Sequence, residues 1–504
     1  MSRTRDLLLT DLRHTLRELG KDGGLTSPSI YDTAQVIRLA PPAEGIWPAL
    51  DWLIDQQRAD GGWGDPRVPR ARDLPTLAAI LALHTYGNRR RAREAVQAGL
   101  AFLRRQAVHW NGALPEDLTA GLELLLPRLL EEARAVGLDL SPEPYTALAA
   151  LGARRRRLIA QLKPQAGTTA FHSWEAWGDA AHPELLDGEG SVGHSPAATA
   201  RWLRAAAGRP ELAGEVERAH DYLARAARAT GVDIPGVVPT CWPTPHFERV
   251  FALHSLYLAG FLNHPALQDV VEPQVDAVQR AFGPHGIGFS DHFAPDGDDT
   301  AAAIAVLWEQ GRSADAGVLQ RFTAGDHYCA WPGELQPSLS VTAHVAHTLR
   351  ARSGNAEVSR AFMIERQRSD GRWPGDKWNG SWLYTTWRVA LALGDDQAAR
   401  EALTRAQAAI LAYQLPDGGW GGQSPNAEET AYGILALRGL QRLGCSSPLA
   451  EASIARANRW MLRAYQPFAE PEVTCWLAKE PYRPRRISRT IELSALLSGI
   501  EQGS

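Results

Sequence analysis

Helical periodicity dominates the pattern of hydrophobic and polar positions along this chain. Segments rich in Ala, Leu and Arg follow one another, separated by turns that contain Pro and Gly, and strand-like alternation is nearly absent. The segment from Ala301 to Trp308 is apolar at every position, which favours a buried helix. The pattern therefore predicts an all-α protein.

One short turn sequence occurs three times. It has the form Q-x-x-D-G-x-W and lies at residues 57–63, 367–373 and 414–420. The unit corresponds to the end of one helix, a turn, and an indole that covers the next helix. Repeated units of this kind indicate a stacked or closed array of helices. Chance similarity is the alternative, but the same four residue types match in every copy.

Three carboxylates are crowded together immediately before the apolar helix. They are Asp296, Asp298 and Asp299, and they follow a loop rich in Pro, Gly and His. Like charges at this spacing beside an apolar interior cannot all ionise, so we expect at least one carboxyl pKa to rise and leave a neutral acid as a proton donor. Helix capping is a plainer interpretation. A cation site is another, although calcium loops spread their ligands over about a dozen residues.

Composition excludes several classes of function. The chain has 504 residues, 44% of them hydrophobic and 22% charged, which is typical of a soluble protein of two or more domains. A net charge of −4 gives no basic field for nucleic acid. No signal-peptide core and no apolar run of about 18 residues is seen, so we expect a cytoplasmic protein without an integral membrane segment. The four cysteines lack metal-site spacing.

Taken together, these motifs resemble those of the class II diterpene cyclases, relatives of the triterpene cyclases. The repeats resemble the QW motifs of that superfamily, and residues 296–301 resemble its D-x-D-D-T-A acid motif. Further segments match the family in the same order along the chain, and the resemblance covers nearly all of it: S-I-Y-D-T-A at 29–34, S-P-A-A-T-A at 195–200, D-K-W at 376–378, E-E-T-A-Y at 428–432 and W-L-A-K-E-P-Y at 476–482.

The resemblance implies two α/α-barrel domains, called β and γ, with the active site between them. Residues 1–44 would pack with the β domain, residues 45–275 would form the γ domain, and residues 276–504 would form the β domain with the acid motif. No D-D-x-x-D motif is present, so ionisation of the diphosphate is not expected. A downstream class I terpene synthase would be needed if the pathway continues.

The activity implied by the resemblance is cyclisation of geranylgeranyl diphosphate, started by protonation, to a bicyclic diphosphate of the copalyl, halimadienyl or clerodane type. Asp298 would be the proton donor, with Asp296 and Asp299 tuning it. His344 would hold one oxygen of that acid, and its alternative role is a buried core histidine. His172 matches a family histidine that holds the deprotonating water, but the Asn that accompanies it in plant enzymes is absent here.

The diphosphate end of such a substrate requires a cation and positive side chains. By resemblance Glu123, with Asp117 nearby, would bind Mg²⁺. Lys377 and Arg157 would bind the diphosphate, although the register within the run of four arginines is open. Solvated helix charges are the plain alternative for Glu123 and for the arginine run.

Aromatic rings along the cavity can stabilise passing carbocations. Trp174, Trp378 and Tyr384 are candidates, and structural packing is their alternative role.

Other functions stay open at this stage. A sesquiterpene cyclase that converts farnesyl diphosphate to drimenyl diphosphate would keep the same chemistry with a shorter substrate. Hopene-type cyclisation is less expected, because it needs no diphosphate ligands. A non-enzymatic helical-repeat binding scaffold, or a prenyltransferase β subunit, could share the repeats, but no zinc-ligand spacing is present. The product skeleton, the terminal base and the oligomeric state do not follow from the residues.

Overall fold

The described chain is mostly helical, as predicted. The computed structural model describes residues 2–115, 117–334, 336–353, 357–394, 396–445, 447–469 and 475–501. Two short antiparallel hairpins accompany the helices: β1 (Thr323–Ala324) with β2 (His327–Tyr328), and β3 (Trp476–Leu477) with β4 (Pro481–Tyr482). The all-α fold class is confirmed.

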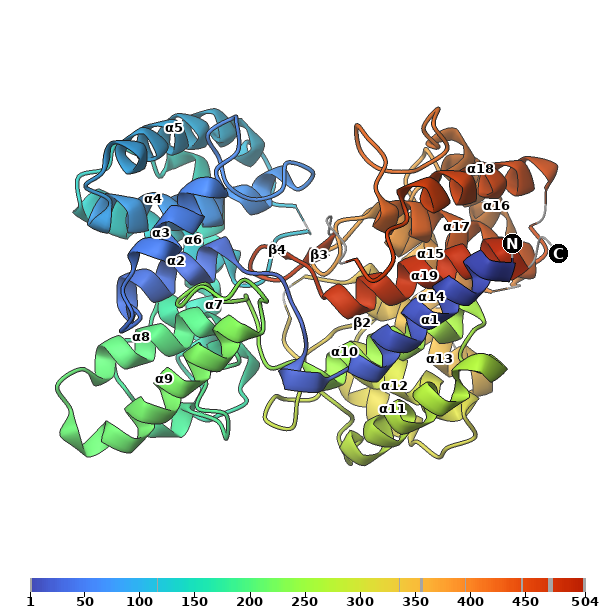
Figure 1. The fold of residues 1–504 in the computed structure, drawn as a ribbon, viewed down its shortest axis with the longest axis horizontal. Helices are drawn as coiled ribbons and strands as arrows, with labels where there is room; N and C mark the ends of the chain where they lie inside the picture. Colours follow the sequence, from blue (N-terminus) through green and yellow to red (C-terminus); the bar gives the residue numbers. More distant parts are fainter. Residues whose placement is uncertain are drawn as a thin grey trace.

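The helices form two domains, which lie side by side in Figure 1. The γ domain contains α2 (Ile30–Leu39), α3 (Trp47–Asp55), α4 (Asp73–Tyr86), α5 (Arg90–Gln106), α6 (Leu122–Ala135), α7 (Thr146–Ile159), α8 (Pro196–Ala206) and α9 (Ala213–Arg228). The β domain contains α1 (Ser2–Glu18), α10 (Pro245–Ala259), α11 (Gln268–Ala281), α12 (Gly297–Glu309), α13 (Leu339–Ser353), α14 (Glu357–Glu365), α15 (Trp382–Leu393), α16 (Arg400–Ala412), α17 (Ala427–Arg442), α18 (Pro448–Ala464) and α19 (Arg485–Glu501).

Short 3₁₀ helices connect many of these elements. They are Lys21–Gly23, Pro69–Arg72, Ala107–Trp110, Glu143–Tyr145, Thr169–Ala176, Pro183–Leu185, Pro210–Leu212, Pro265–Leu267, Ala316–Phe322 and Gln397–Ala399. In the described part of the chain, no helix is both long and apolar enough to span a membrane.

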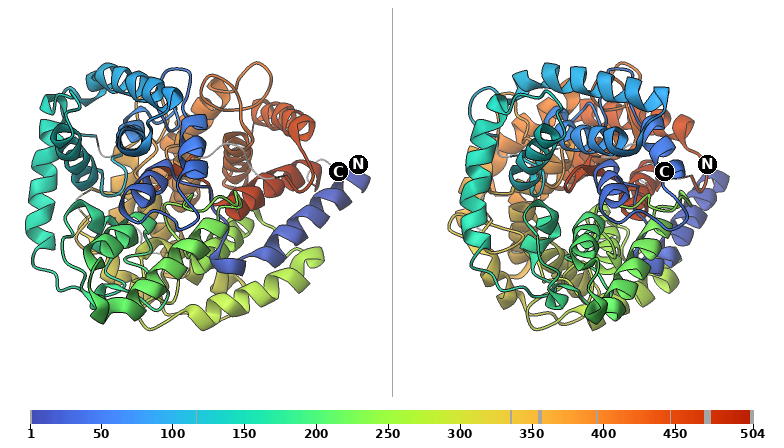
Figure 2. Two further views of the ribbon diagram at one scale, coloured as in Figure 1. Left: turned by 60° about the vertical axis from the view of Figure 1, so that its left-hand side comes forward. Right: turned by 90° about the vertical axis from the view of Figure 1, so that its left-hand side faces the viewer.

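Packing corrects both predicted domain boundaries. Helix α2, predicted to lie with the β domain, packs against α4 and α8 of the γ domain. Helices α10 and α11, predicted to belong to the γ domain, pack against α12 of the β domain, and α10 also packs against α19. Helix α1 does pack on the β domain, along α19, and the two views of Figure 2 show the start of α1 close to the end of α19. The γ domain is therefore inserted between α1 and the rest of the β domain.

The three repeated turns share one hydrogen-bonding pattern. Trp63, Trp373 and Trp420 are fully buried or nearly so, and each indole N–H donates to a backbone carbonyl ten residues earlier, at 2.6–2.8 Å. The Gln that opens each turn donates both to the Gly carbonyl of its own turn and to a carbonyl of a following helix. The repeats therefore join the end of one helix to the body of another.

The β3–β4 hairpin of the β domain reaches into the γ domain (Figure 1). Lys479, in the turn of this hairpin, is fully buried. Its ammonium lies 2.7 Å from the carboxylate of Glu175, 3.3 Å from that of Asp32 and 2.6 Å from the hydroxyl of Ser195. A buried ammonium is tolerated only with such partners, so these contacts fix the hairpin in the γ domain.

Candidate functional site

A cavity of about 530 Å³ is lined by both domains, as expected for an active site at their interface. Glu123 on α6, Arg155 on α7 and His172 on the Thr169–Ala176 turn line it from the γ domain. Asp298 at the start of α12 and Lys377, before α15, line it from the β domain. The volume lies within the range of about 300–1,000 Å³ that is usual for small-molecule sites.

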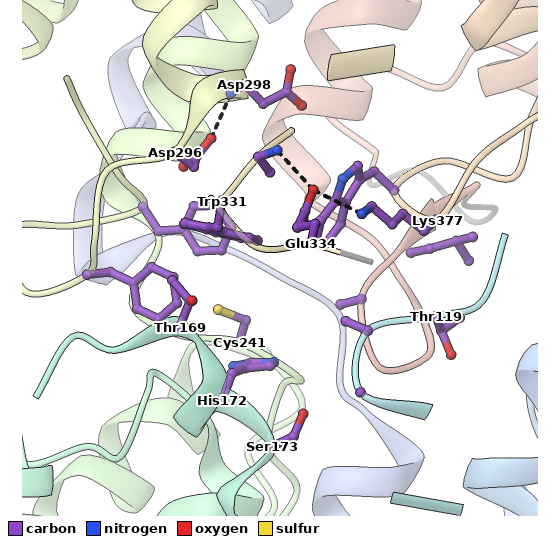
Figure 3. Close-up of a pocket in the computed structure, with 18 of the residues that line it drawn as sticks. Thr119, Thr169, His172, Ser173, Cys241, Asp296, Asp298, Trp331, Glu334 and Lys377 are labelled. Atoms are coloured by element: carbon purple, nitrogen blue, oxygen red, sulfur yellow. Dashed lines mark hydrogen bonds and ion pairs between the residues drawn. The ribbon is translucent and has the colours of Figure 1, made fainter. Parts of the chain in front are cut away.

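The acid motif is held by the first turn of α12. Asp296 is the N-cap residue, and its carboxylate accepts the backbone N–H groups of Asp298 at 3.0 Å and of Asp299 at 2.7 Å. Because Asp296 faces its own helix, Asp298 is free to face the cavity, where its side chain keeps 15% exposure. Figure 3 shows the Asp298 carboxyl above the cavity, turned away from the Asp296 carboxylate.

The expected rise in carboxyl pKa occurs at the two flanking residues. Burial raises the pKa of Asp296 to about 7, partly opposed by its hydrogen bonds. Burial also raises the pKa of Asp299 well above its usual value, and the charge of Asp296 adds to this rise. The three carboxyls of the motif therefore do not all carry a full negative charge at neutral pH.

His344, on α13, binds the acid directly. Its Nδ1 makes a short hydrogen bond to Oδ1 of Asp298. The imidazole is 2% exposed and packs edge-on against the rings of His254 and Phe251, so it is held in one orientation. The structure thus gives His344 both properties considered above: it is buried in the core, and it contacts the acid.

Two carboxylate–cation pairs line another part of the cavity. Nε of Arg155 lies 2.9 Å from Glu123, and Nζ of Lys377 lies 3.0 Å from Glu334. The prediction that Arg157 binds the diphosphate is corrected by this geometry. Arg157 is exposed, and Arg155 lines the cavity instead. Residues 155 and 159 lie one helical turn apart on the face of α7 that also carries the buried Leu148 and Gly152, whereas residue 157 lies on the opposite face.

Asp117 does not lie with Glu123. Its side chain is about half exposed and 3.9 Å from Arg70, and it does not line the cavity. No cluster of three or more His, Cys, Asp or Glu side chains arranged to hold a metal occurs among the described residues. A single carboxylate such as Glu123 is still compatible with Mg²⁺, because this ion is commonly bound by one or two carboxylates together with substrate phosphates and water.

The aromatic lining differs in part from the predicted one. Trp378 lines the cavity, but Trp174 is buried in the γ-domain core and Tyr384 lies behind the cavity wall, against His344 and Trp476. Much of the wall is formed by other aromatic residues, none of which was predicted to line the cavity: Phe247, Phe251, Phe289, Phe293, Trp331, Trp476 and Tyr482. Three of them meet Trp331 or Trp378 edge-on, with ring centroids 5.6–6.0 Å apart.

His172 faces the cavity beside Cys241 and Ser173 (Figure 3). Its Nδ1 is 2.9 Å from the carbonyl oxygen of Gly193. A carbonyl only accepts, so Nδ1 carries the hydrogen and Nε2 carries the free electron pair. Burial lowers the pKa of His172 to about 3, and the nearby charge of Lys479 adds to this, so the imidazole is neutral.

Comparisons with known proteins agree with this architecture. A family model described as the squalene-hopene cyclase C-terminal domain matches residues 335–434. The chain is 46% identical to the (+)-kolavenyl diphosphate synthase of Herpetosiphon aurantiacus, over 99% of this chain and 98% of that protein. It is 31% identical to the terpentedienyl-diphosphate synthase of Kitasatospora griseola, over 92% of this chain and 95% of that protein.

A solved structure shows the same two-domain arrangement. The ent-copalyl diphosphate synthase from Streptomyces platensis superposes with a TM-score of 0.78 at 29% identity, covering 98% of this chain and 99% of that one. Similarity of this extent over the whole chain leaves neither a scaffold nor a prenyltransferase subunit as an alternative. The chain belongs to the bacterial class II diterpene cyclases and is an enzyme of that class.

Proposed function

We propose that this cyclase acts on geranylgeranyl diphosphate, protonates its terminal alkene from Asp298 and releases a bicyclic diphosphate with the diphosphate group intact. One observation carries the proposal: a single aromatic-lined cavity contains an acid held by a helix N-terminus and, elsewhere on its wall, the cations Arg155 and Lys377. A linear substrate with an apolar chain and an anionic end matches both features.

The proton donor is assigned from its hydrogen bonds. If Nδ1 of His344 donates to Oδ1 of Asp298, then the acidic hydrogen resides on Oδ2, directed toward the cavity. An alkene is a very weak base, so the acid must be neutral, oriented and kept from bulk water. The raised pKa values of Asp296 and Asp299 reduce the negative charge beside Asp298, and this favours release of its proton.

The remaining cavity residues have matching roles in this scheme. The faces of Trp331, Trp378 and Trp476 stabilise cationic centres without acting as a base. Arg155 and Lys377 bind the diphosphate, and Glu123 would hold Mg²⁺, which neutralises diphosphate charge when bound. Nε2 of His172 is a neutral base in the γ-domain wall, and it would accept the final proton directly or through a water molecule.

The relatives favour one product class among the three that the sequence leaves open. The chain is 46% identical to a kolavenyl diphosphate synthase, whereas its identity to a labda-7,13-dienyl diphosphate synthase is 32%. We therefore propose a product of the clerodane (kolavenyl) type, formed when hydride and methyl shifts precede loss of the proton. Copalyl-type and halimadienyl-type products, and a drimenyl product from farnesyl diphosphate, are the alternatives.

The test is to incubate the protein with geranylgeranyl or farnesyl diphosphate and Mg²⁺, remove the diphosphate enzymatically, and identify the alcohol by mass spectrometry and NMR. Asp298→Asn should lower the rate by about 10²–10⁴-fold with the fold unchanged. Asp291→Asn is the matched control, because Asp291 lies on the same loop but is 80% exposed. Turnover by Asp298→Asn at the wild-type rate would contradict the acid assignment, and a preference for farnesyl diphosphate would replace the proposed substrate.

A further inference from the structure

Lys377 already has a partner inside the cavity. Its ammonium lies 3.0 Å from Oε2 of Glu334 and donates to the carbonyl of Gln336 at 2.8 Å. The same oxygen of Glu334 accepts the backbone N–H of Ala330 at 3.1 Å. Figure 3 shows both contacts of Glu334, in the loop that follows β2. Glu334 and Lys377 are therefore held against each other by the backbone of one loop.

Both charges are withdrawn from bulk water. The side chain of Lys377 is 8% exposed and that of Glu334 is 11% exposed. An isolated charge in such a site is costly, so each group stabilises the ionised form of the other. Burial raises the pKa of Glu334 while the charge of Lys377 lowers it, with a net rise.

The second cation of the cavity is paired in the same way, since Arg155 contacts Glu123. Among the described residues that line the cavity, Arg155 and Lys377 are the only arginine and lysine, and a carboxylate neutralises each of them. An anionic group that binds here must compete with these carboxylates. Glu123 has a proposed role toward Mg²⁺, but Glu334 has no role in the scheme above.

We propose that Glu334 is the internal counter-ion of Lys377 and that the substrate's diphosphate displaces it from the ammonium on binding. Glu334 is thus a positioning residue that acts through Lys377. It holds the ammonium at the cavity wall in the free enzyme and lowers the affinity of this site for anions. This inference rests on the proposed function, because it takes Lys377 as a diphosphate ligand.

A double-mutant cycle tests this inference. The four proteins are wild type, Glu334→Gln, Lys377→Gln and the double variant. The measurement is the Kd for inorganic pyrophosphate by calorimetry, with Mg²⁺ and with EDTA. Glu334→Gln keeps the shape of the side chain and removes its charge, so Kd should fall about tenfold, equivalent to about 1.4 kcal/mol. In the Lys377→Gln background the same change should alter Kd by less than about twofold.

Steady-state kinetics provide a second measurement. Because the counter-ion competes with substrate binding and not with protonation, Glu334→Gln should lower KM and leave kcat unchanged. A loss of folding would instead lower the active fraction and kcat. The matched control is Glu94→Gln, which removes an exposed carboxylate 2.9 Å from Arg90 and should change neither constant.

The outcomes separate this inference from the proposed function. If Lys377→Gln binds pyrophosphate as tightly as wild type, Lys377 is not a diphosphate ligand. The diphosphate site of the proposed function is then wrong, and the inference about Glu334 is wrong with it. If Lys377→Gln weakens binding but Glu334→Gln leaves it unchanged or weaker, the counter-ion role alone is wrong. An equal gain from Glu334→Gln with and without Lys377 would also overturn that role.

Discussion

At the scale of single residues, the backbone of one helix turn gives three similar carboxyls different environments. All three line the cavity, but Asp296 accepts two backbone N–H groups, Asp299 is fully buried, and Asp298 keeps the largest exposed fraction, 15%. The crowding of charge was evident from the sequence. Which carboxyl faces the cavity was not evident from spacing alone, because that depends on where the helix begins.

A pH prediction belongs to this scale. The pKa of Asp296 is about 7, so its carboxyl is neutral below this pH and ionised above it. The negative charge then binds the proton of Asp298 more tightly and weakens it as an acid. The rate under saturating substrate should therefore fall as pH rises through about 7. The measurement is kcat from pH 5.5 to 9.

Asp296→Asn isolates the cause of that pH dependence. Asparagine is also a good N-cap residue, so the helix start should be preserved. The fall near pH 7 should disappear in this variant. If it persists with the same midpoint, another group controls the proton transfer.

The arginine run shows what the sequence could and could not provide for the site. Four consecutive arginines look alike in sequence, and the family resemblance pointed to Arg157. Helical phase would have selected Arg155, which shares a face with Gly152 and Ile159. By contrast, nothing local marked Glu334 or Trp331, whose place in the wall depends on how a loop of the β domain meets the γ domain.

At the scale of elements, the repeated turns connect helices within each of the two domains. The indole of Trp420 fills a buried space next to Gly433 of α17, and its N–H is bonded to the carbonyl of Ile410. The sequence predicted these turns well, because their hydrogen bonds are local and repeat with the motif. Their role as structural tryptophans follows from complete burial away from the cavity.

Replacing such an indole should therefore lower the stability of the fold and leave the catalytic rate of the folded protein unchanged. Trp420→Ala leaves a large void and an unpaired carbonyl, so the free energy of unfolding should fall by about 3–5 kcal/mol. The measurement is denaturant unfolding followed by circular dichroism. Trp47→Ala, at a position 37% exposed, is the control and should lose far less. Similar losses in the two variants would argue against a structural role for the repeated turn.

At the scale of the whole molecule, the number and order of the domains could be predicted, but their boundaries could not. Helix α2 has an apolar face that includes Tyr31, Ala34 and Ile37, and this face would suit either domain. Its position is decided by contact with α4 and α8, which are remote in sequence. The chain passes between the domains more than once, so sequence order does not assign each segment.

The buried ammonium of Lys479 provides a prediction at this scale. Lys479→Met leaves the carboxyls of Asp32 and Glu175 without their cation, which should cost about 3–5 kcal/mol. Burial already raises the pKa of both carboxyls, and loss of the ammonium would raise it further. In the variant, the folded state favours the neutral form of both carboxyls. Its loss of stability relative to wild type should therefore grow as pH rises from 5 to 8.

The measurement is the thermal unfolding midpoint of Lys479→Met against wild type across that pH range. Lys163→Met, which removes an exposed ammonium, is the control and should show no such trend. A deficit that does not change with pH would contradict the assignment of the cost to the two carboxyls.

The hairpin that carries Lys479 also restricts how a prenyl chain can reach the acid. Separating the domains would strip a fully buried ammonium from two carboxylates, so a hinge that swings open at each turnover is disfavoured. A fixed opening is therefore the expected route for the chain. Leu158 and Leu162 are about half exposed and also line the cavity, so we expect the opening to lie beside these two apolar side chains of the γ domain. The hydrocarbon tail would slide past these two leucines while the protein around it stays closed.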